Sequence, residues 1–423
     1  MRVWFAGVFA IICVAPAARA DGPLTFEQAI HLALAHNERS GIAELNVEVA
    51  EGDIDKARVA FLPALTAGGT NAWTPWDKRP TDVTKGSLML SQPLIVPSAF
   101  PLYDQAKHNL EGTRAQTVDD KRQLAFDAAK AYLAVLLADQ VVQAAQKKLD
   151  TAKEEVKATN VQYEAKIVSS NDTTRAQIDL SNSEHELSVD QGNLDAAYVS
   201  LGFVIAAKTK GPLVTPLQLL AQSAKPVTNV DQLVAASVKQ RPDLEARKQD
   251  ALAAHDFARE PRYRFFPTLG VAATMNAAST KIPGDGYYLD GSLQFTASWV
   301  IFDAGSRNAD ERTRDAQAAI ADLTTDLLGR QVDEQVRTAL VQLASAQAAL
   351  VAARDAMTAA QKSASEEQIL YGQGLATALE LVDANEQRFL AEVQFAEDQF
   401  ALANSYLALL QAMGKGPLDL ETP

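Results

Sequence analysis

Residues 288–301 read Tyr-Leu-Asp-Gly-Ser-Leu-Gln-Phe-Thr-Ala-Ser-Trp-Val-Ile, and their alternation decides the fold. The apolar positions of this stretch are Leu289, Leu293, Phe295, Ala297, Trp299 and Ile301. Successive side chains of a strand point to opposite faces, so a period of two predicts a strand with one apolar and one polar face. About ten such residues are enough to cross a bilayer with lipid on one side and water on the other.

Three further segments alternate in the same way. Residues 268–276 complete a hairpin over about 268–302, and a weaker alternation predicts a hairpin over about 65–95. The loops fall at residues 74–80 and 279–286, which are rich in turn formers. Aromatic residues, which favour the membrane interface, stand at the strand ends: Trp73, Trp76, Tyr287 and Tyr288. The chain therefore offers four membrane-crossing strands.

Four strands are too few to close a barrel. Open strand edges in lipid leave backbone groups unsatisfied, at several kcal/mol each. Two copies would give eight strands and a nearly filled interior, whereas three copies would give twelve strands around a water-filled lumen. We therefore expect a homotrimer with a 12-stranded transmembrane β-barrel in outer-membrane lipid.

Outside the hairpins the apolar period changes to three and a half residues. Apolar residues follow a 4,3,4,3 spacing from Leu124 to Val156, and again from Val332 to Ala364. This spacing is typical of helices that wind around each other in a left-handed sense. A helix from about Pro101 to Lys166 would be roughly 100 Å long. A second stripe (Leu133, Leu137, Gln140, Ala144) gives the helix two contact faces, so the helices can form a ring, although an ordinary extended coiled coil is the alternative.

The two halves of the sequence match each other. Phe61-Leu62-Pro63 aligns with Phe265-Phe266-Pro267, and the helical ladders align with Tyr163 on Tyr371. The match indicates an internally duplicated chain, with a first structural repeat at 21–227 and a second at 228–423. Each repeat is predicted to contain a helix, a β-hairpin, a long helix, a tip turn and a return helix. The first helices are expected at about 24–61 and 229–264, and the tip turns at 167–171 and 372–377.

The amino terminus has the pattern of a signal peptide. Arg2 precedes an apolar run, and small residues precede Asp21, so residues 1–20 are expected to be removed on export. Cys13 is the one cysteine of the chain and lies in this segment, which excludes disulfides and thiolate sites from the mature protein. No later stretch of 18 apolar residues occurs, so a transmembrane helix is not expected.

Composition and motifs argue against several classes of function. The net charge of −14 disfavours nucleic acid as a partner. The five histidines are scattered, and no phosphate-binding glycine loop or nucleophile motif occurs. We expect no catalytic site, no metal site and no cofactor, so that any energy must come from a partner protein.

Four short motifs together resemble those of the TolC-type outer-membrane efflux family. They are Leu24-Thr25-Phe26-Glu27-Gln28-Ala29-Ile30, Phe61-Leu62-Pro63, Tyr371-Gly372-Gln373-Gly374-Leu375 and Leu381-Val382-Asp383-Ala384. Their order and spacing cover essentially the whole mature chain. The resemblance implies a mainly α fold, in which a trimeric α-barrel of coiled-coil helices continues into a 12-stranded β-barrel. It also implies an equatorial belt formed by about residues 205–228 and the chain after Met413.

The resemblance implies a passive outer-membrane exit duct of a tripartite efflux or type I secretion system. Such a duct carries solutes from an inner-membrane pump and a periplasmic adaptor (membrane fusion) protein across the periplasm and outer membrane. The alternatives are a periplasmic adaptor or a structural coiled-coil protein without a pore. An adaptor normally has one helical hairpin flanked by compact β-domains, and a rod lacks amphipathic strands. Both features disfavour these alternatives.

The resemblance also implies a gate at the periplasmic tip. Glu380 and Asp383 match an acidic ring that would attract cations and could bind divalent ones, and Asp172 and Tyr371 match a polar latch. Gly372, Gly374 and Leu375 match the tip turn where partners dock.

Ala376 stands where the best-known family member has an arginine that pairs with the latch aspartate, so Asp172 would need another partner. The alternatives are a helix cap for Asp172 and a solvated helix face for Glu380 and Asp383.

Overall fold

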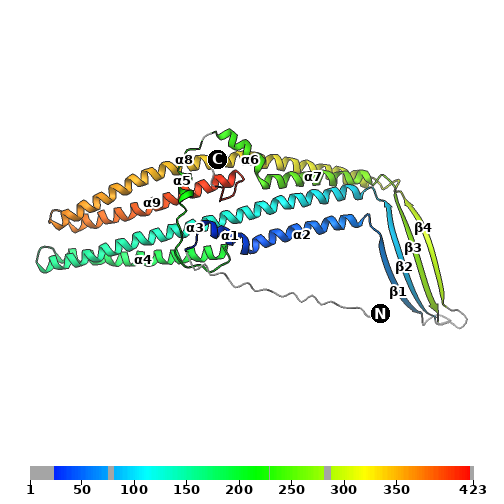
Figure 1. Cartoon of the computed structure of the whole chain (residues 1–423), viewed down its shortest axis with the longest axis horizontal. Coiled ribbons are helices and arrows are strands. Elements are labelled where there is room, and N and C mark those ends of the chain that lie inside the picture. Colours follow the sequence, from blue (N-terminus) through cyan, green and yellow to red (C-terminus); the bar gives the residue numbers. More distant parts are fainter. Residues whose placement is uncertain (1–22, 75–80, 228, 281–286, 420–423) are drawn as a thin grey trace.

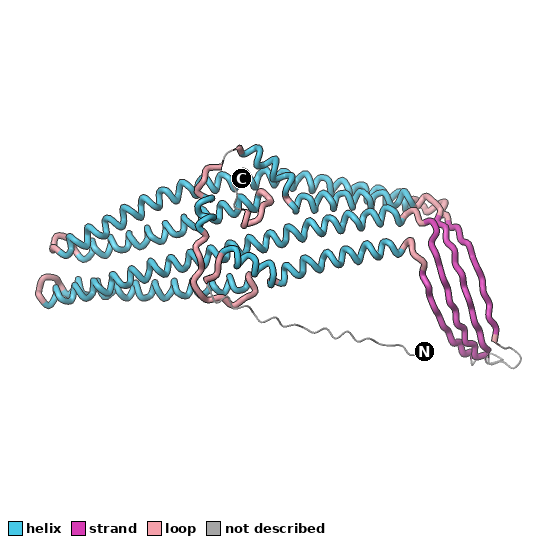
Figure 2. Tube along the Cα trace, in the orientation of Figure 1, coloured by secondary structure: helices cyan, strands magenta, loops and turns pink. Residues whose placement is uncertain are grey.

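The computed structural model describes residues 23–74, 81–227, 229–280 and 287–419. The molecule is elongated: long helices lie side by side, and a sheet projects from one end (Figures 1 and 2). The predicted signal peptide, Trp76 and the loop residues 281–286 lie outside the described residues.

The helices and strands follow the predicted order. They are α1 Phe26–His36, α2 Glu38–Val59, β1 Ala64–Thr74, β2 Thr81–Ile95, α3 Ala99–Glu164, α4 Ser170–Val204, α5 Leu217–Ser223, α6 Val230–Gln240, α7 Pro242–Tyr263, β3 Thr268–Thr280, β4 Tyr288–Ser298, α8 Ser306–Gly372 and α9 Ala378–Ala412. The two predicted hairpins and the two long helices with their return helices are confirmed. The long helices have 66 and 67 residues, and the return helices have 35 each.

Each half was predicted to begin with a single helix. This was wrong, because the structure has two helices there: α1 and α2 in the first half, and α6 and α7 in the second. Asn37 is extended (ψ 134°), and its side chain accepts a hydrogen bond from the Arg39 amide, so it ends α1 and caps α2. Arg241 is extended (ψ 119°) because a residue before a proline disfavours helical backbone, and Pro242 begins α7.

The second hairpin also ends earlier than predicted. β4 stops at Ser298, whereas the alternation continues to Ile301. The Trp299 indole donates a hydrogen bond to the Phe265 carbonyl (2.9 Å), and Ala304 and Gly305 turn the chain with positive φ. The last apolar positions of the stretch therefore lie at the junction with α8.

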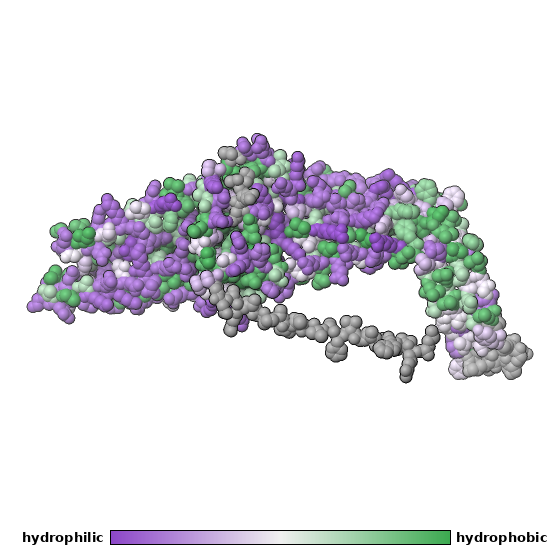
Figure 3. Space-filling view, in the orientation of Figure 1, coloured by the Kyte–Doolittle hydropathy of each residue, from purple (hydrophilic) through white to green (hydrophobic). Residues whose placement is uncertain are grey.

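The four strands form one antiparallel sheet in the order β1-β2-β3-β4. One row across the sheet is apolar and pairs Leu65, Leu90, Ala273 and Leu293 in turn. A row on the other face is small or polar and pairs Gly68, Ser87, Asn276 and Asp290. Figure 3 shows the hydrophobic residues gathered over the sheet. Among the described residues, the outer edges of β1 and β4 pair with no strand.

The main core lies midway along the helices. Its largest buried side chains come from three helices and include Ile30, Phe126, Tyr132, Phe400 and Tyr406. The Tyr132 hydroxyl lies 2.7 Å from the carbonyl oxygens of both Leu24 and Val214. This contact fixes the described part of the predicted belt, residues 205–227, across the middle of α3 (Figure 1).

The helix α8 is more apolar than expected, because no stretch able to cross a membrane as a helix was predicted. By length and composition alone, α8 contains an 18-residue window, with mean hydropathy 1.3, that is apolar enough to cross a membrane. The reason is its alanine content rather than a continuous run of large apolar residues. Only 22% of this window is buried, and α8 packs against α7 and α9.

Candidate functional site

The turns α3–α4 and α8–α9 lie together at the end of the molecule remote from the sheet (Figure 1). Both are built alike: one residue has a left-handed backbone, Lys166 (φ 61°) in the first turn and Gly374 (φ 73°) in the second. The backbone amide of the following residue, Ile167 or Leu375, donates a hydrogen bond to a carbonyl oxygen in the last turn of the preceding helix (2.8 and 2.9 Å). The side chains of Ile167 and Leu375 are each 71% exposed, so each hairpin presents an apolar residue at its tip.

The return helices α4 and α9 both begin with a capping box. The amide and hydroxyl of Ser169 donate to the Asp172 carboxylate (2.9 and 2.8 Å). The amide and hydroxyl of Thr377 donate to the Glu380 carboxylate (2.8 and 2.9 Å). Both sets of hydrogen bonds lower the carboxyl pKa, with the backbone bond contributing most. The capping alternative for Asp172 therefore matches the structure, and the same arrangement occurs at Glu380.

The predicted latch residues do not meet within the protomer. Tyr371 is buried, and its hydroxyl lies 3.2 Å from the Thr159 hydroxyl of α3. Its contact is therefore with the first hairpin, but not with Asp172. Ala376 packs against a small apolar cluster that contains Tyr371 and Leu381.

Lys148 forms two ion pairs, one of which links the two hairpins, and this role was not predicted from the sequence. Its ammonium lies 2.7 Å from Glu186 of α4 and 2.5 Å from Glu386 of α9. It also lies 4.5 Å from the centre of the Phe389 ring. Burial lowers the pKa of Lys148, but the two carboxylates outweigh this and raise it. A signal was present, because the second apolar stripe of α3 continues from Ala144 into Lys148.

Further polar contacts join α3 to α9. Lys147 pairs with Glu392 at 2.8 Å, and the guanidinium of Arg388 donates to the Thr151 hydroxyl at 3.1 Å. The contacts from Lys147 to Thr159 therefore bind the first hairpin to the second along roughly three turns of α3.

Glu155 lies within the same stretch of α3. It is only 6% exposed, and neither carboxylate oxygen accepts a hydrogen bond from any residue that the structure describes. Burial, with a smaller contribution from Asp179, raises its pKa to about 7. The buried hydroxyl of Ser183 on α4 also has no hydrogen-bond partner within the described part of the chain.

The acidic residues of the second tip are exposed. Glu380 is held by its capping box, whereas Asp383 makes no hydrogen bond or ion pair with the part of the chain that the structure describes. Within the same residues, no group of three or more histidine, cysteine or acidic side chains is arranged to hold a metal ion.

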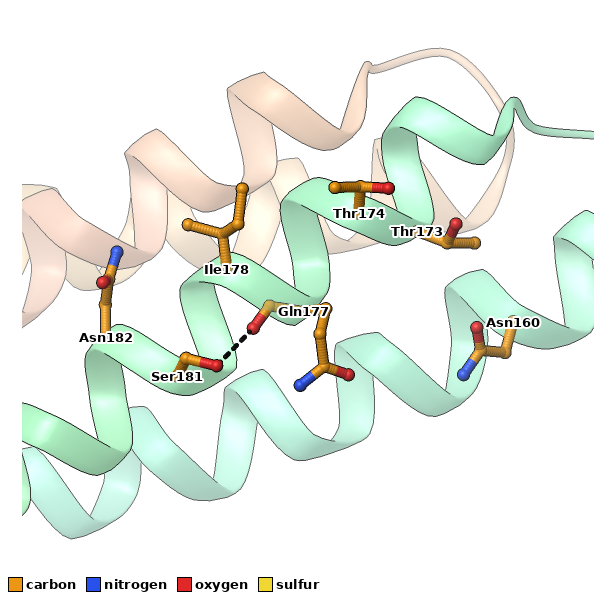
Figure 4. Close-up of a pocket in the computed structure, with 7 residues that line it drawn as sticks. All are labelled: Asn160, Thr173, Thr174, Gln177, Ile178, Ser181 and Asn182. Carbon is orange, nitrogen blue, oxygen red and sulfur yellow. Dashed lines mark hydrogen bonds between the residues drawn. The ribbon is translucent and has the colours of Figure 1, made fainter.

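A groove of about 470 Å³ lies between α3 and α4 near the first tip (Figure 4). Its lining is uncharged: Asn160, Thr173, Thr174, Gln177, Ile178, Ser181 and Asn182. The Ser181 hydroxyl donates to the Gln177 backbone carbonyl (3.0 Å). Such a surface can bind a polar helix without burying an unpaired charge.

Comparison with known proteins places the chain in a family. The family model for outer membrane efflux proteins matches residues 29–207 and 233–415. The outer membrane efflux protein BepC of Brucella suis is 22% identical over 410 residues, 93% of this chain and 86% of BepC. The solvent efflux pump outer membrane protein SrpC of Pseudomonas putida is 26% identical over 187 residues, 42% of this chain and 38% of SrpC.

Solved structures show the same fold. The outer membrane protein VceC of Vibrio cholerae matches with a TM-score of 0.77 at 16% identity, over 92% of this chain and 96% of VceC. The open state of the outer membrane channel MtrE of Neisseria gonorrhoeae matches with a TM-score of 0.77 at 19% identity, over 94% of this chain and 90% of MtrE. This chain therefore belongs to the outer membrane efflux protein family and is an outer-membrane protein whose helices extend into the periplasm.

Proposed function

We propose that three copies of the chain form a passive exit duct for solutes, with a 12-stranded barrel in the outer membrane and an α-helical barrel below it. The observation that carries this proposal is the sheet. It has an apolar and a polar face, and among the described residues no strand pairs with the outer side of β1 or β4. Leu293 and Phe295 are 65% and 74% exposed in the protomer, so contact with lipid would remove large apolar surfaces from water. Pairing of β4 with β1 of the next copy would satisfy both edges.

The chain is proposed to be a tandem duplication, with repeats 21–227 and 228–423. Matching helix lengths support it: α1 and α6 have 11 residues, and α2 and α7 have 22. The matched tip turns and capping boxes support it as well, because Lys166 and Asp172 take the places of Gly374 and Glu380. Two similar hairpins per chain would give a trimer six similar units around one axis.

The tip is proposed to be the gate. Lys148 and Tyr371 hold the two hairpins of a protomer together, and Glu380 and Asp383 form the acidic ring around the opening. Asp172 contributes by capping the start of α4, since Ala376 at the family's arginine position cannot form an ion pair with it. Because each protomer would supply the same residues, three copies of each carboxylate would surround the axis and attract cations.

The partners are proposed to be a periplasmic adaptor and an inner-membrane pump. They would dock at the tip turns, where Gly372, Gly374 and Leu375 lie in one hairpin and Ile167 in the other. The uncharged groove of the first hairpin would receive a polar helix of the adaptor. We assign no catalytic role to the chain, so the pump would supply the energy for transport.

The test is purification of the mature protein in detergent and reconstitution into planar lipid bilayers. A heat-sensitive trimer on gels, discrete channel currents and copurification with an inner-membrane transporter are the expected results. A protein that stays monomeric and soluble without detergent, and that produces no currents, would refute the duct and favour a pore-free rod.

A further inference from the structure

One face of α3 near the tip meets the second hairpin at regular intervals. Lys148 binds Glu386, Thr151 receives a hydrogen bond from Arg388, and Thr159 contacts Tyr371. Glu155 lies four residues after Thr151 and four before Thr159, on the same face of the helix. It is therefore buried on the face of α3 that contacts the second hairpin, with Asp179 of α4 nearby.

Among the described residues, no cation forms an ion pair with Glu155, and none is a cause of its pKa shift. Lys148 is bound to Glu186 of α4 and Glu386 of α9, and the guanidinium of Arg388 on α9 is directed at the Thr151 hydroxyl. The remaining groups that face this region are acidic or uncharged: Asp179, Ser183 and Glu186 on α4, Glu386 on α9, and Thr159 and Tyr371 beside the tip. An ionised Glu155 would thus be buried, unpaired and close to other carboxylates, which is unfavourable.

We propose that Glu155 makes closure of the tip dependent on protons: its carboxyl group stays neutral while the hairpins are together, and its ionisation favours their separation. This rests on the proposed function, in which the tip is the gate. On separation the proton passes to the periplasmic water, and the carboxylate becomes hydrated. Protonation reverses the change, because a neutral carboxyl group costs far less to bury.

The direction of the effect follows from the pKa of Glu155. Burial raises it from 4.5 to about 7. The closed arrangement is therefore most stable relative to the separated one below pH 4.5. It loses stability as the pH rises from 4.5 to about 7, and the loss is complete above that pH. A difference of this size shifts the ratio of closed to separated hairpins on the order of 100-fold. Partial burial also raises the pKa of Asp179, so Asp179 would add to the effect.

Labelling of a buried cysteine measures this separation directly. Ser183→Cys places a thiol on the face of α4 between Asp179 and Glu186, and Ser181→Cys places one on the exposed side of the same helix. The full-length protein with Cys13→Ala then carries a single thiol. The ratio of maleimide labelling rates at the two sites cancels the effect of pH on thiol reactivity.

The ratio is measured from pH 5 to pH 8 with wild-type Glu155, with Glu155→Gln and with Glu154→Gln. Gln keeps the shape of the protonated carboxyl group, and Glu154 is an exposed neighbour. We expect the ratio to rise at least tenfold with wild-type Glu155 and with Glu154→Gln, and to stay at its low-pH value with Glu155→Gln.

A flat ratio in the wild type, a parallel rise in Glu155→Gln or a loss of the rise in Glu154→Gln would each overturn the proposal. Labelling reports access between the helices whether or not the protein conducts. A failure here would therefore leave the duct function intact, and an absence of bilayer currents would leave the labelling result interpretable.

Discussion

The ammonium of Lys148 lies 2.5 Å from the carboxylate of Glu386, and this ion pair joins the two helical hairpins of one protomer near their tips. Lys148 is the better buried partner, since its side chain is 9% exposed and that of Glu386 is 40% exposed. The pair therefore restrains the hairpins at a point where neither the tip turns nor the main core holds them.

Replacing Lys148 should loosen the tip. In Lys148→Met, two carboxylates that shared one cation are left facing each other, so closure should weaken by about 1 kcal/mol, or roughly fivefold in the ratio of closed to open channels. The measurement is the frequency of spontaneous openings in planar bilayers. Lys147→Met is the matched control, because its pair with Glu392 is formed by a half-exposed lysine. Equal effects of the two variants would show that position 148 has no special role.

The two faces of the sheet should respond differently to a charge. Leu293 and Ser292 are neighbours on β4 that point to opposite faces. Leu293→Lys would place an ammonium in lipid at a cost of about 2–4 kcal/mol, whereas Ser292→Lys would face water. We expect Leu293→Lys to reduce the yield of the heat-sensitive trimer in outer-membrane fractions, and Ser292→Lys to assemble normally with altered ion selectivity. The reverse result would contradict the assignment of the faces.

The strands and long helices were predictable because their periods of two and three and a half extend over many residues. The helix breaks at Asn37 and Arg241 were not recognised, although a capping residue and a proline mark them. Both signals are local, and the apolar pattern continues across them. A single capping residue or proline therefore ends a helix even where the longer apolar pattern continues.

The tip was predictable only in part. The motif around Tyr371 located the turn, but the partner of Tyr371 is Thr159, more than 200 residues away in sequence. Lys148 and Glu155 were missed because a lysine and a glutamate on a long helix usually lie on its solvated face. They are buried because α4 and α9 both pack against α3. Information of this kind does not exist in the sequence of one helix.

The proposed acidic ring can be tested with a specific pair of substitutions. Glu380→Gln keeps the capping box with Thr377, since glutamine can also fill this position, and removes the charge. Combined with Asp383→Asn, it should weaken block of single-channel current by divalent cations added on the periplasmic side and reduce cation selectivity. Glu397→Gln is the control, because Glu397 is an exposed carboxylate of α9 several turns from the tip. Unchanged block in the double variant would remove Glu380 and Asp383 from the ring.

The two tip turns differ at one position whose effect on stability is testable. Lys166 and Gly374 have the same left-handed backbone, which is unfavourable for a residue with a Cβ atom by roughly 1 kcal/mol. Lys166→Gly should therefore stabilise the first turn, and Gly374→Ala should destabilise the second by a similar amount. Hydrogen exchange of the Ile167 and Leu375 amides, which donate into these turns, reports each change locally. We expect roughly fivefold slower exchange at Ile167 and fivefold faster exchange at Leu375.

Gly372→Ala provides the control for these turn variants. Gly372 is the last residue of α8 and has open space where a Cβ atom would stand, so alanine should favour the helix. Exchange at Leu375 should then slow or stay constant, in contrast to Gly374→Ala. If both glycine variants accelerate exchange, the left-handed backbone is not the cause, and any substitution near the tip disturbs the turn.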